Sequence, residues 1–316
     1  MIEVIVNSVT PLAEGIVGLE LQRDSGESLP GFEPGAHIDV CLPGGLVRQY
    51  SLCNDAADPT RYYLGIGKSV ISRGGSSYIH DSLRAGDRLT IGEPRSLFSL
   101  SREASHHSFI AGGIGITPIL SMIRSCIRNG LPWKLTYCVR SRARAAYLDE
   151  IASLEGEVHL HVDEEASEAT DIGAVLKRVQ PGEHVYCCGP GGLMDAVEAH
   201  VREIGLEPGR VHFERFEAPA DKKFAEDVAS FTVVLARAGK RCVVERDESI
   251  LECLERHGIT PPFSCREGLC RSCEVPLISG EAEHRDYVLS ADEQREGRSL
   301  MICVSRARTP EIVIDL

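Results

Sequence analysis

Four cysteines near the C-terminal end are the feature that most constrains the fold of this chain. Three stand close together as Cys265, Cys270 and Cys273 in the segment PFSCREGLCRSCEVPLISG, and Cys303 follows in LMICVSR. The spacing C-x4-C-x2-C with one distant cysteine is that of a plant-type 2Fe-2S cluster. One loop then supplies three thiolates and a separate strand supplies the fourth. The spacing therefore predicts that these four cysteines bind a 2Fe-2S cluster.

A structural zinc site is the alternative explanation of the same four cysteines. Zinc sites typically combine two short C-x2-C pairs, or pairs of cysteine and histidine. The longer spacing between Cys265 and Cys270 and the lone position of Cys303 argue against this pattern. Gly268, inside the loop, is expected to turn the backbone close to the cluster sulfides, because glycine adopts conformations that other residues avoid.

The remaining eight cysteines have a simpler explanation. They lie mostly in apolar, strand-like surroundings, where a free thiol behaves as a small buried hydrophobe. A disulfide framework would be unusual in the cytoplasm, which keeps thiols reduced. These eight residues are Cys41, Cys53, Cys126, Cys138, Cys187, Cys188, Cys242 and Cys253.

Charge and hydropathy exclude several classes of partner. The formal net charge is -13, which disfavours binding to nucleic acid or to an anionic membrane. No apolar run approaches the ~18 residues of a membrane span. The opening MIEVIVNSVTPLAEG lacks the basic region and long apolar run of a signal peptide. We therefore expect a cytoplasmic protein that binds neither nucleic acid nor membrane.

The 316 residues exceed one typical core and divide into three blocks and a linker. Residues 1–102 are short strand-like runs cut by glycine and proline, a pattern typical of an antiparallel β-barrel. Residues 103–216 alternate strands with helices, which predicts a parallel α/β sheet. Residues 217–227 are polar and charged, as in a linker. Residues 228–316 begin with a strand pair, followed by a helix and the cysteine loop.

Two glycine-rich turns in the middle block favour a nucleotide site. In IAGGIGITPILSM (110–122) the turn lies between a strand and a helix, where a backbone can approach a pyrophosphate. The turn is not G-x-G-x-x-G, so a plain tight connection between strand and helix stays an alternative. In YCCGPGGLMDAV, Cys188, Gly189 and Pro190 again end a strand before a helix. Ligands of open α/β sheets bind at the carboxyl ends of strands, so both turns should face one crevice.

Two segments of the front block carry residue types that suit a flavin. RQYSLCN combines Arg48, Gln49, Tyr50 and Ser51, and strand alternation puts the first and third on one face. A flavin needs a cation for its phosphate, a flat partner for its ring and hydrogen-bond partners at its edge. From these residues alone, an ordinary barrel strand is the favoured explanation. In SRGGSSYIHDSL, a nest that includes Gly74, Gly75 and Ser76 could hold a phosphate.

Taken together, these motifs resemble the ferredoxin–NADP reductase superfamily over residues 1–216. The C-terminal position of the ferredoxin-like block is similar to the phthalate dioxygenase reductase and vanillate O-demethylase reductase family. The matches to the motifs R-x-Y-S, G-G-x-G-x-T-P and C-G-P are Arg48, Tyr50, Ser51, Gly112, Gly113, Gly115, Thr117, Pro118, Cys188, Gly189 and Pro190.

The resemblance implies a fold and a set of cofactors. The fold is multidomain, with a flavin-binding β-barrel, an α/β nucleotide-binding domain and an α+β β-grasp ferredoxin domain. The flavin is FMN, with Arg48 and the loop 74–76 near its phosphate and with Tyr50 and Ser51 at its ring. Gln49 is a further implied cofactor-binding residue. The reductant is NADH, with Thr117 and Cys188 near the nicotinamide. Ser51, Cys188 and Phe216 are the implied catalytic residues.

The resemblance also implies an activity and a partner. The chain is expected to be the NADH-dependent reductase component of a Rieske-type aromatic-ring oxygenase or O-demethylase, passing electrons from NADH to FMN, to 2Fe-2S and to the oxygenase. A reductase for another acceptor, such as a cytochrome, and a redox sensor without turnover are the alternatives. Arg140, Arg142 and Arg144 leave NADPH open, since arginine accommodates the 2′-phosphate in related sites. The oligomeric state stays open, with a monomer as one possibility.

Overall fold

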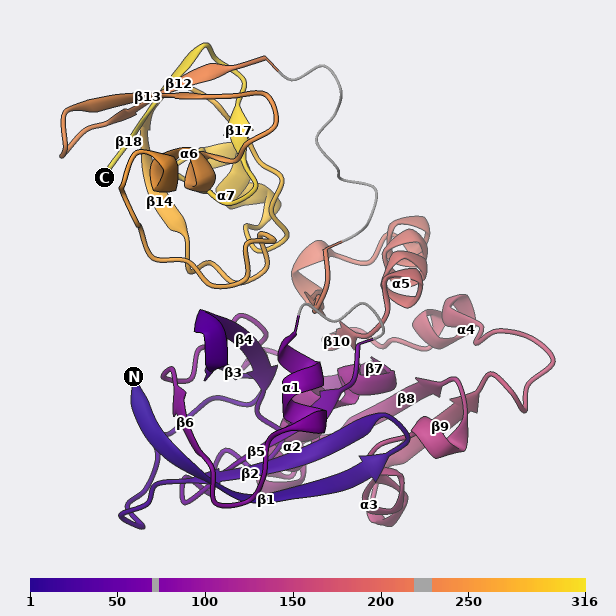
Figure 1. The fold of residues 1–316 in the computed structure, drawn as a ribbon. Helices are drawn as coiled ribbons and strands as arrows, with labels where there is room; N and C mark the ends of the chain where they lie inside the picture. Colours follow the sequence, from indigo (N-terminus) through magenta and orange to yellow (C-terminus); the bar gives the residue numbers. More distant parts are fainter. Residues whose placement is uncertain (70–73, 219–228) are drawn as a thin grey trace. The chain divides into compact units, whose positions relative to one another are not determined.

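The computed structural model describes residues 1–69, 74–218 and 229–316. The chain forms two compact units, Met1–Glu214 and Arg215–Leu316 (Figure 1). The predicted linker at 217–227 lies outside the described residues from 219 onward. Within the described part of the chain, no helix has the length and apolar character required to cross a membrane.

A six-stranded antiparallel sheet forms the front of the first unit. Its order is β4-β3-β6-β1-β2-β5, and a bridge from Leu52, directly after β4, to Leu64 of β5 joins the two edges into a barrel. Alternate side chains point inward, so the interior is filled by buried aliphatic residues such as Val4, Ile38 and Leu64. The strands are β1 (Ile2–Ala13), β2 (Ile16–Gln22), β3 (His37–Leu42), β4 (Leu46–Ser51), β5 (Tyr62–Gly67) and β6 (Arg88–Ile91), with helices η1 (Pro43–Gly45) and α1 (Gly75–Asp81).

A five-stranded parallel sheet forms the rest of the first unit, in the order β11-β10-β7-β8-β9. Its strands are β7 (His106–Gly112), β8 (Trp133–Val139), β9 (Glu157–Val162), β10 (Glu183–Cys188) and β11 (Val211–Glu214). The helices are η2 (Gly113–Gly115), α2 (Ile116–Asn129), η3 (Arg142–Arg144), α3 (Leu148–Ser153), α4 (Ile172–Lys177), α5 (Gly191–Ile204) and η4 (Pro208–Arg210).

Helices cover both faces of this parallel sheet. Phe109 and Tyr186 pack on the side of α2 and α3, whereas their neighbours Ile110 and Val185 pack on the side of α4 and α5. Successive strand residues point to opposite faces, so strands buried on both sides read as continuous apolar runs. Glycines with left-handed backbones end α2 at Gly130 and α5 at Gly205, since glycine adopts this conformation most readily.

The second unit is a mixed sheet with a helix across it. Its strand order is β13-β12-β18-β14-β16, with β12 parallel to β18 and antiparallel to β13. The strands are β12 (Phe231–Leu235), β13 (Lys240–Val244), β14 (Glu274–Ser279), β16 (Ser299–Met301) and β18 (Glu311–Ile314), with the pair β15 (Ala282–Glu283) and β17 (Arg306–Ala307). The helices are α6 (Ile250–Arg256) and α7 (Ala291–Glu296). Together with the first unit, this arrangement confirms the predicted multidomain fold class.

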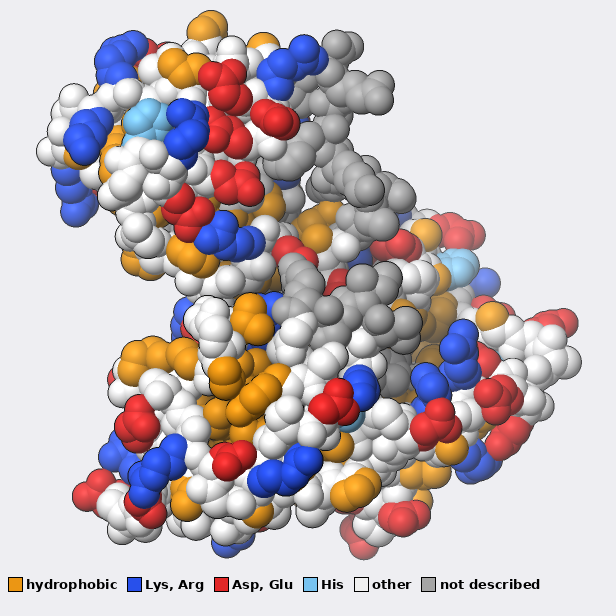
Figure 2. Space-filling view, viewed as in Figure 1, with side chains coloured by type: hydrophobic (Ala, Val, Ile, Leu, Met, Phe, Trp, Pro, Cys, Tyr) orange, Lys and Arg blue, Asp and Glu red, His pale blue; other side chains and the backbone are white. Residues whose placement is uncertain are grey.

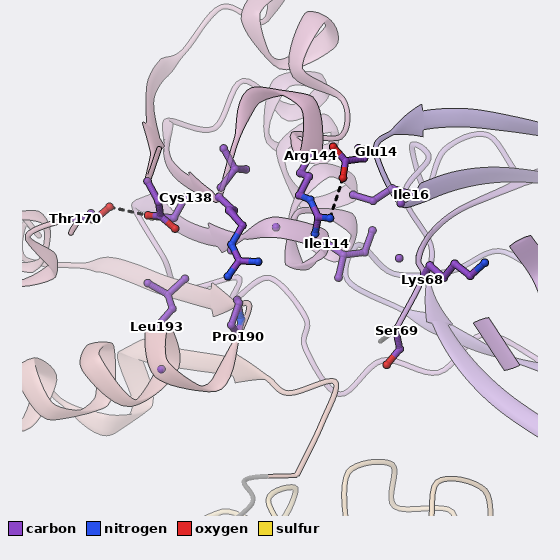
Figure 3. A pocket seen from close by; sticks show the side chains of 18 of the residues that line it. Glu14, Ile16, Lys68, Ser69, Ile114, Cys138, Arg144, Thr170, Pro190 and Leu193 are labelled. Atoms are coloured by element: carbon purple, nitrogen blue, oxygen red, sulfur yellow. Dashed lines mark hydrogen bonds and ion pairs between the residues drawn. The ribbon is translucent and has the colours of Figure 1, made fainter. Parts of the chain in front are cut away.

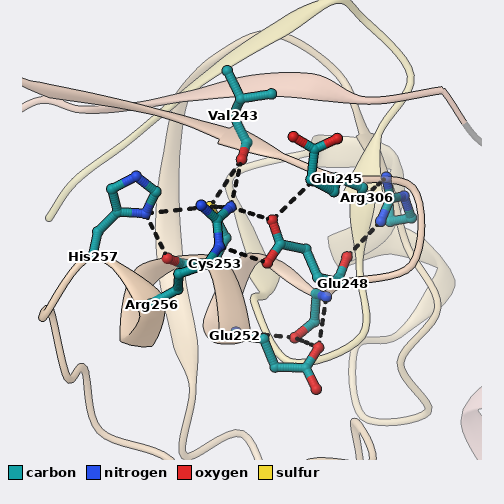
Figure 4. A network of polar contacts seen from close by, with 9 residues as sticks. Val243, Glu245, Glu248, Glu252, Cys253, Arg256, His257 and Arg306 are labelled. Atoms are coloured by element: carbon teal, nitrogen blue, oxygen red, sulfur yellow. Dashed lines mark hydrogen bonds and ion pairs between the residues drawn. The ribbon is translucent and has the colours of Figure 1, made fainter.

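A buried arginine holds the start of the second unit to its last strands (Figure 4). Arg306 in β17 is fully buried and donates to the carbonyl oxygens of Ala229, Glu245 and Glu248 at 3.1, 3.0 and 2.6 Å. Its guanidinium also lies 5.0 Å from the centre of the Phe231 ring. Because three backbone carbonyls and an aromatic face stabilise this cation, burying it is tolerated.

Candidate functional site

The structure brings the four predicted cysteines together in the second unit. The loop between α6 and β14 carries Cys265, Cys270 and Cys273, and Cys303 follows β16. The Cys265 thiol hydrogen-bonds with those of Cys270 and Cys303, and the Cys273 thiol also contacts Cys303. Hydrogen bonds from Cys270 and Cys303 lower the pKa of Cys265, which favours the thiolate. The thiolate is the form that binds metal.

Backbone amides also favour the thiolate form of Cys265. The N–H groups of Glu267 and Leu269 donate to Cys265 Sγ at 3.3 and 3.4 Å. Among the described residues, no three His, Cys, Asp or Glu side chains are arranged around the position of a single metal ion. The four thiols instead contact one another in a chain, in which Cys265 meets Cys270 and Cys303, and Cys303 also meets Cys273. This donor set fits a 2Fe-2S cluster, where four thiolates ligate two irons.

Left-handed backbone conformations shape the cysteine loop. Arg266 and Arg271, each next to a cysteine, have φ of 61° and 57°, and Gly268 has φ of 71°. Such angles are uncommon for residues with a side chain and occur where the surroundings impose them. A Cβ at position 268 would also lie 2.7 Å from Val304 Cγ2. Glycine is therefore required at 268 by both conformation and space.

A pocket of about 1120 Å³ opens in the first unit at the carboxyl ends of the parallel strands (Figure 3). The barrel contributes one wall, with Ile16, Lys68 and Ser69. The α/β sheet contributes the other wall through residues at or after the ends of β7, β8, β9 and β10. These include Gly112, Gly113, Ile114, Cys138, Arg140, Arg144, Asp163, Thr170, Pro190 and Leu193. The pocket lies in the crevice expected at the carboxyl ends of the strands. Its volume is large enough for part of a dinucleotide.

The two glycine-rich turns pack directly against each other. A Cβ on Gly112 would lie 2.5 Å from Pro190 Cδ, and one on Gly189 would lie 2.8 Å from Gly112 Cα. A Cβ on Gly115 would collide with the carbonyl of Cys188. These glycines therefore permit close approach of two loops. Gly113 differs, because its φ is 51° and no atom lies within 4 Å of the place that a Cβ would take.

Two predicted nucleotide residues and one predicted thiol are buried. Thr117 is 1% exposed, donates to the carbonyl of Ile114 at 2.9 Å and turns its methyl toward Gly65 of the barrel. Pro118 lies in the first turn of α2 and is also buried. Cys188 is fully buried at the end of β10, where burial raises the pKa of its thiol. None of these three side chains lines the pocket as the described residues define it.

The predicted flavin residues lie on β4 and at the start of α1. Arg48 packs over Gly75, where a Cβ would lie 2.6 Å from the Arg48 Cγ, so a cation stands beside the glycine-rich turn. Gly74 has φ of 93°, and Ser76 Oγ accepts a hydrogen bond from the Ser69 amide at 3.2 Å. A cation, hydroxyls and a glycine cradle are the groups that a flavin phosphate requires. The residues present therefore fit FMN.

The other two residues of β4 that precede Ser51 have different surroundings. Gln49 donates to Asp39 Oδ1 on the neighbouring strand at 3.1 Å. Tyr50 packs against the barrel core, and burial raises its pKa to about 12. Phe216, the third predicted catalytic residue, is the second residue of the second unit and is 40% exposed.

Sequence reasoning missed Glu214 as a site residue. It ends β11, and its Oε2 accepts a hydrogen bond from Ser51 Oγ at 3.5 Å. Part of the side chain remains exposed, but protein surrounds the carboxylate, and this burial raises its pKa to about 8. A carboxylate closing a strand at the carboxyl edge of a parallel sheet was the available signal. It was not decisive, because its partner lies in another domain.

Glutamates engage two of the three arginines that had left NADPH open. Arg142 binds both carboxylate oxygens of Glu165 at 2.7 and 3.0 Å, and Arg144 binds Glu14 at 2.9 Å. Arg140 lines the pocket, but so does the carboxylate-bearing Asp163. Acidic and basic side chains are likewise interspersed over the face shown in Figure 2. The arginine run is therefore largely neutralised by nearby acids.

Comparisons with known proteins find matches to both units of the chain. Residues 233–308 match the family described as the 2Fe-2S iron-sulfur cluster binding domain. Residues 93–211 match the N-terminal domain of dimethylamine monooxygenase subunit DmmA-like proteins. Phthalate dioxygenase reductase of Burkholderia cepacia is 40% identical over 316 residues, 98% of this chain and 96% of that protein.

Two solved structures extend the comparison. A phthalate dioxygenase reductase, described as a modular structure for electron transfer from pyridine nucleotides to 2Fe-2S, matches 100% of this chain and 98% of its own, with 39% identity and a TM-score of 0.73. An intact type IV self-sufficient cytochrome P450 monooxygenase matches 99% of this chain with 34% identity and a TM-score of 0.91. This chain spans 41% of the length of that P450.

Proposed function

Because the chain belongs to the phthalate dioxygenase reductase family, we propose that it is the NADH-dependent reductase component of an oxygenase system. Electrons pass from NADH through FMN and a 2Fe-2S cluster to a terminal Rieske-type oxygenase acting on an aromatic compound. The observation that carries this proposal is the gathering of four thiols in one unit of a chain whose other unit holds a dinucleotide-sized pocket.

Each part of the chain has its own task in this proposal. Residues 1–102 bind FMN, residues 103–216 bind NADH, residues 217–227 link the parts and residues 228–316 bind the cluster. The separate barrel, parallel sheet and mixed sheet support this division.

The barrel residues hold and orient the flavin. Arg48 and the turn at 74–76 neutralise its phosphate, while Gln49, Tyr50 and Ser51 border its ring. When bound, FMN converts the two-electron donor NADH into a source of single electrons for the cluster. Phe216 retains its implied role beside the ring, which rests on the family resemblance.

Ser51 and Glu214 control a proton beside the flavin strand. With a pKa raised to about 8 by burial, Glu214 is largely protonated at neutral pH. Its carboxyl group can then share a proton with Ser51 Oγ at 3.5 Å. A neutral carboxyl also avoids placing a negative charge where electrons arrive. Ser51 and Glu214 therefore hold a proton at a defined place without requiring water.

The α/β residues bind and select the nicotinamide nucleotide. The packed turns that contain Gly112, Gly113, Gly115, Gly189 and Pro190 form the floor of the pocket, with Thr117, Pro118 and Cys188 supporting them from behind. NADH is the preferred nucleotide, because Asp163 repels a 2′-phosphate and can accept a hydrogen bond from a ribose 2′-hydroxyl. The ion pairs of Arg142 and Arg144 with glutamates support the same preference, because they occupy cations that could otherwise bind a 2′-phosphate.

A haem protein is the second candidate for the electron acceptor. The similarity to a self-sufficient cytochrome P450 monooxygenase favours it. The two candidates differ only in the partner, because NADH, FMN and the cluster serve both. Delivery of electrons to a purified Rieske oxygenase or to a cytochrome P450, measured side by side, separates them.

The cytoplasm is the proposed location. All twelve cysteines are free thiols, which suits a reducing compartment.

Anaerobic titration with NADH tests the proposed function. Purified protein that contains FMN, iron and sulfide should bleach in its flavin and cluster absorbance together. Bleaching of flavin alone, in protein loaded with iron and sulfide, would show that the cluster is absent or isolated. Sustained NADH oxidation with an artificial one-electron acceptor distinguishes the reductase from a redox sensor, which needs no turnover.

A further inference from the structure

One stripe of helix α2 contacts the barrel along its whole length. Thr117, Ser121, Arg124 and Arg128 recur at helical spacing and therefore share a face. Three of them bind the barrel segment Cys53–Asp55, through the backbone of its first two residues and the carboxylate of the third. The helix that begins at the nucleotide turn is thus tied to the chain that leaves the flavin strand.

The two central contacts of this stripe are polar; the first is buried and the second is partly buried. Ser121 is fully buried and donates from Oγ to the carbonyl oxygen of Asn54 at 2.9 Å. Arg124 donates to the carbonyl oxygen of Cys53 and forms an ion pair with Glu150 of α3 at 2.5 Å. Removing a partner from such a contact leaves a buried carbonyl unsatisfied, which is costly.

At the N-terminal end of α2, the stripe packs directly against the barrel. A Cβ on Gly65 of β5 would lie 2.7 Å from Thr117 Cγ2 and 2.9 Å from the Tyr147 hydroxyl oxygen. Tyr147 has a left-handed φ of 60° and hydrogen-bonds with the Cys53 thiol. A non-glycine residue in that conformation is held by its surroundings. The barrel strand β5 and the residues Thr117 and Tyr147 of the α/β part are therefore in close contact here.

The position of the stripe connects the two binding loops. At its start, α2 follows the turn Gly112–Gly115, which packs on the second nucleotide turn. The barrel segment that it grips begins two residues after Ser51, the last residue of the flavin strand β4. A displacement of α2 relative to the barrel would therefore move the nucleotide turn relative to the flavin strand.

We infer that Ser121 and Arg124 are positioning residues that set the approach of the nicotinamide to the flavin. This inference rests on the proposed function, since it needs both ligands to react in the first unit. Hydride transfer requires the reacting atoms within ~3–3.5 Å, and a displacement of 1 Å can slow a reaction about 100-fold. Helix α2 contacts the barrel at both ends of the stripe, and these contacts hold it rigidly in place.

The test uses the holoprotein with Ser121→Ala and with Ser121→Ala/Arg124→Met. We expect the limiting rate of flavin reduction at saturating NADH to fall ~10- to 100-fold in the double variant, and less in the single variant. The long-wavelength absorbance of the nicotinamide–flavin complex should weaken. In the same variants without bound flavin, backbone amides at 52–56 and at 112–117 should exchange hydrogen faster. Reoxidation by the cluster of chemically reduced flavin should not change.

The matched control is Arg88→Met, which removes an exposed barrel arginine from its ion pair with Asp24. It should retain the wild-type reduction rate and complex spectrum. The inference is overturned if either folded variant exchanges faster at 52–56 but keeps the wild-type rate and spectrum, or if exchange at 112–117 is unchanged. Should the double variant not fold, the single variant decides by the same criteria. Failure of NADH to reduce wild-type flavin would instead overturn the proposed function.

Discussion

Ser51 Oγ lies 3.5 Å from Oε2 of Glu214, although 163 residues separate the two in the chain. Ser51 ends a barrel strand, and Glu214 ends the edge strand of the parallel sheet. Their contact places an acid with a raised pKa beside the predicted flavin strand. The hydroxyl and the carboxyl group therefore meet where the barrel contacts the parallel sheet.

Glu214→Gln should reduce the loss of stability as pH rises. Folded Glu214 has a pKa of about 8, against a usual 4.5, so between these values the folded protein holds a proton that the unfolded chain has released. Stability therefore falls as pH rises through this window. The melting temperature of the Gln variant, relative to wild type, should increase from about pH 5 to about pH 8. Ser51→Ala keeps the carboxyl group and should keep the wild-type slope. An unchanged pH profile in Glu214→Gln would contradict the raised pKa.

Cys303→Ala should remove the cluster and spare the flavin. Cys303 contacts both Cys265 and Cys273, so its loss leaves one iron without a ligand. Iron content and cluster absorbance should disappear, and reduction of cytochrome c should fall to background, while NADH still reduces the flavin. Cys253→Ala, a buried thiol of the same unit outside this set, should keep its iron. A folded Cys303→Ala protein with a full complement of iron would refute the ligand assignment.

Gly115→Ala should destabilise the first unit and slow flavin reduction. Its Cβ would collide with the carbonyl of Cys188, so the two nucleotide turns must separate. Overpacking of this kind costs about 1–3 kcal/mol, measurable by urea unfolding. Gly191→Ala is the matched control, because no atom lies within 4 Å of its Cβ position and its φ is not left-handed. Equal stability of the two variants would show that the turns are not tightly packed.

Asp163→Asn should weaken the preference for NADH over NADPH. The substitution removes a charge that faces the pocket and keeps the shape of the side chain. We expect the ratio of kcat/KM for the two nucleotides to change roughly tenfold, equivalent to about 1.4 kcal/mol. Glu164→Gln, a neighbouring exposed position that does not line the pocket, serves as the control. If Asp163→Asn leaves the ratio unchanged, another group selects the nucleotide.

Features that depend on neighbours in the chain could be predicted from the sequence. The ends of α2 and α5 lie at Gly130 and Gly205, because a left-handed helix cap is a local requirement. The alternation of strands and helices predicted the parallel sheet for the same reason. The cysteine spacing indicated a cluster loop, since three of the four thiols belong to one short segment.

The sequence by itself therefore determined the ends of α2 and α5, the alternation of strands and helices that builds the parallel sheet, and the cysteine spacing of the loop. Only the tertiary structure decided that Glu214 meets Ser51, that Thr117 faces Gly65, and that Ser121 and Arg124 grip the segment after the flavin strand. Each of these contacts joins segments more than 50 residues apart. Local spacing specifies hydrogen bonds within a turn or loop, whereas burial, and with it the pKa of Glu214, depends on which distant segments exclude water.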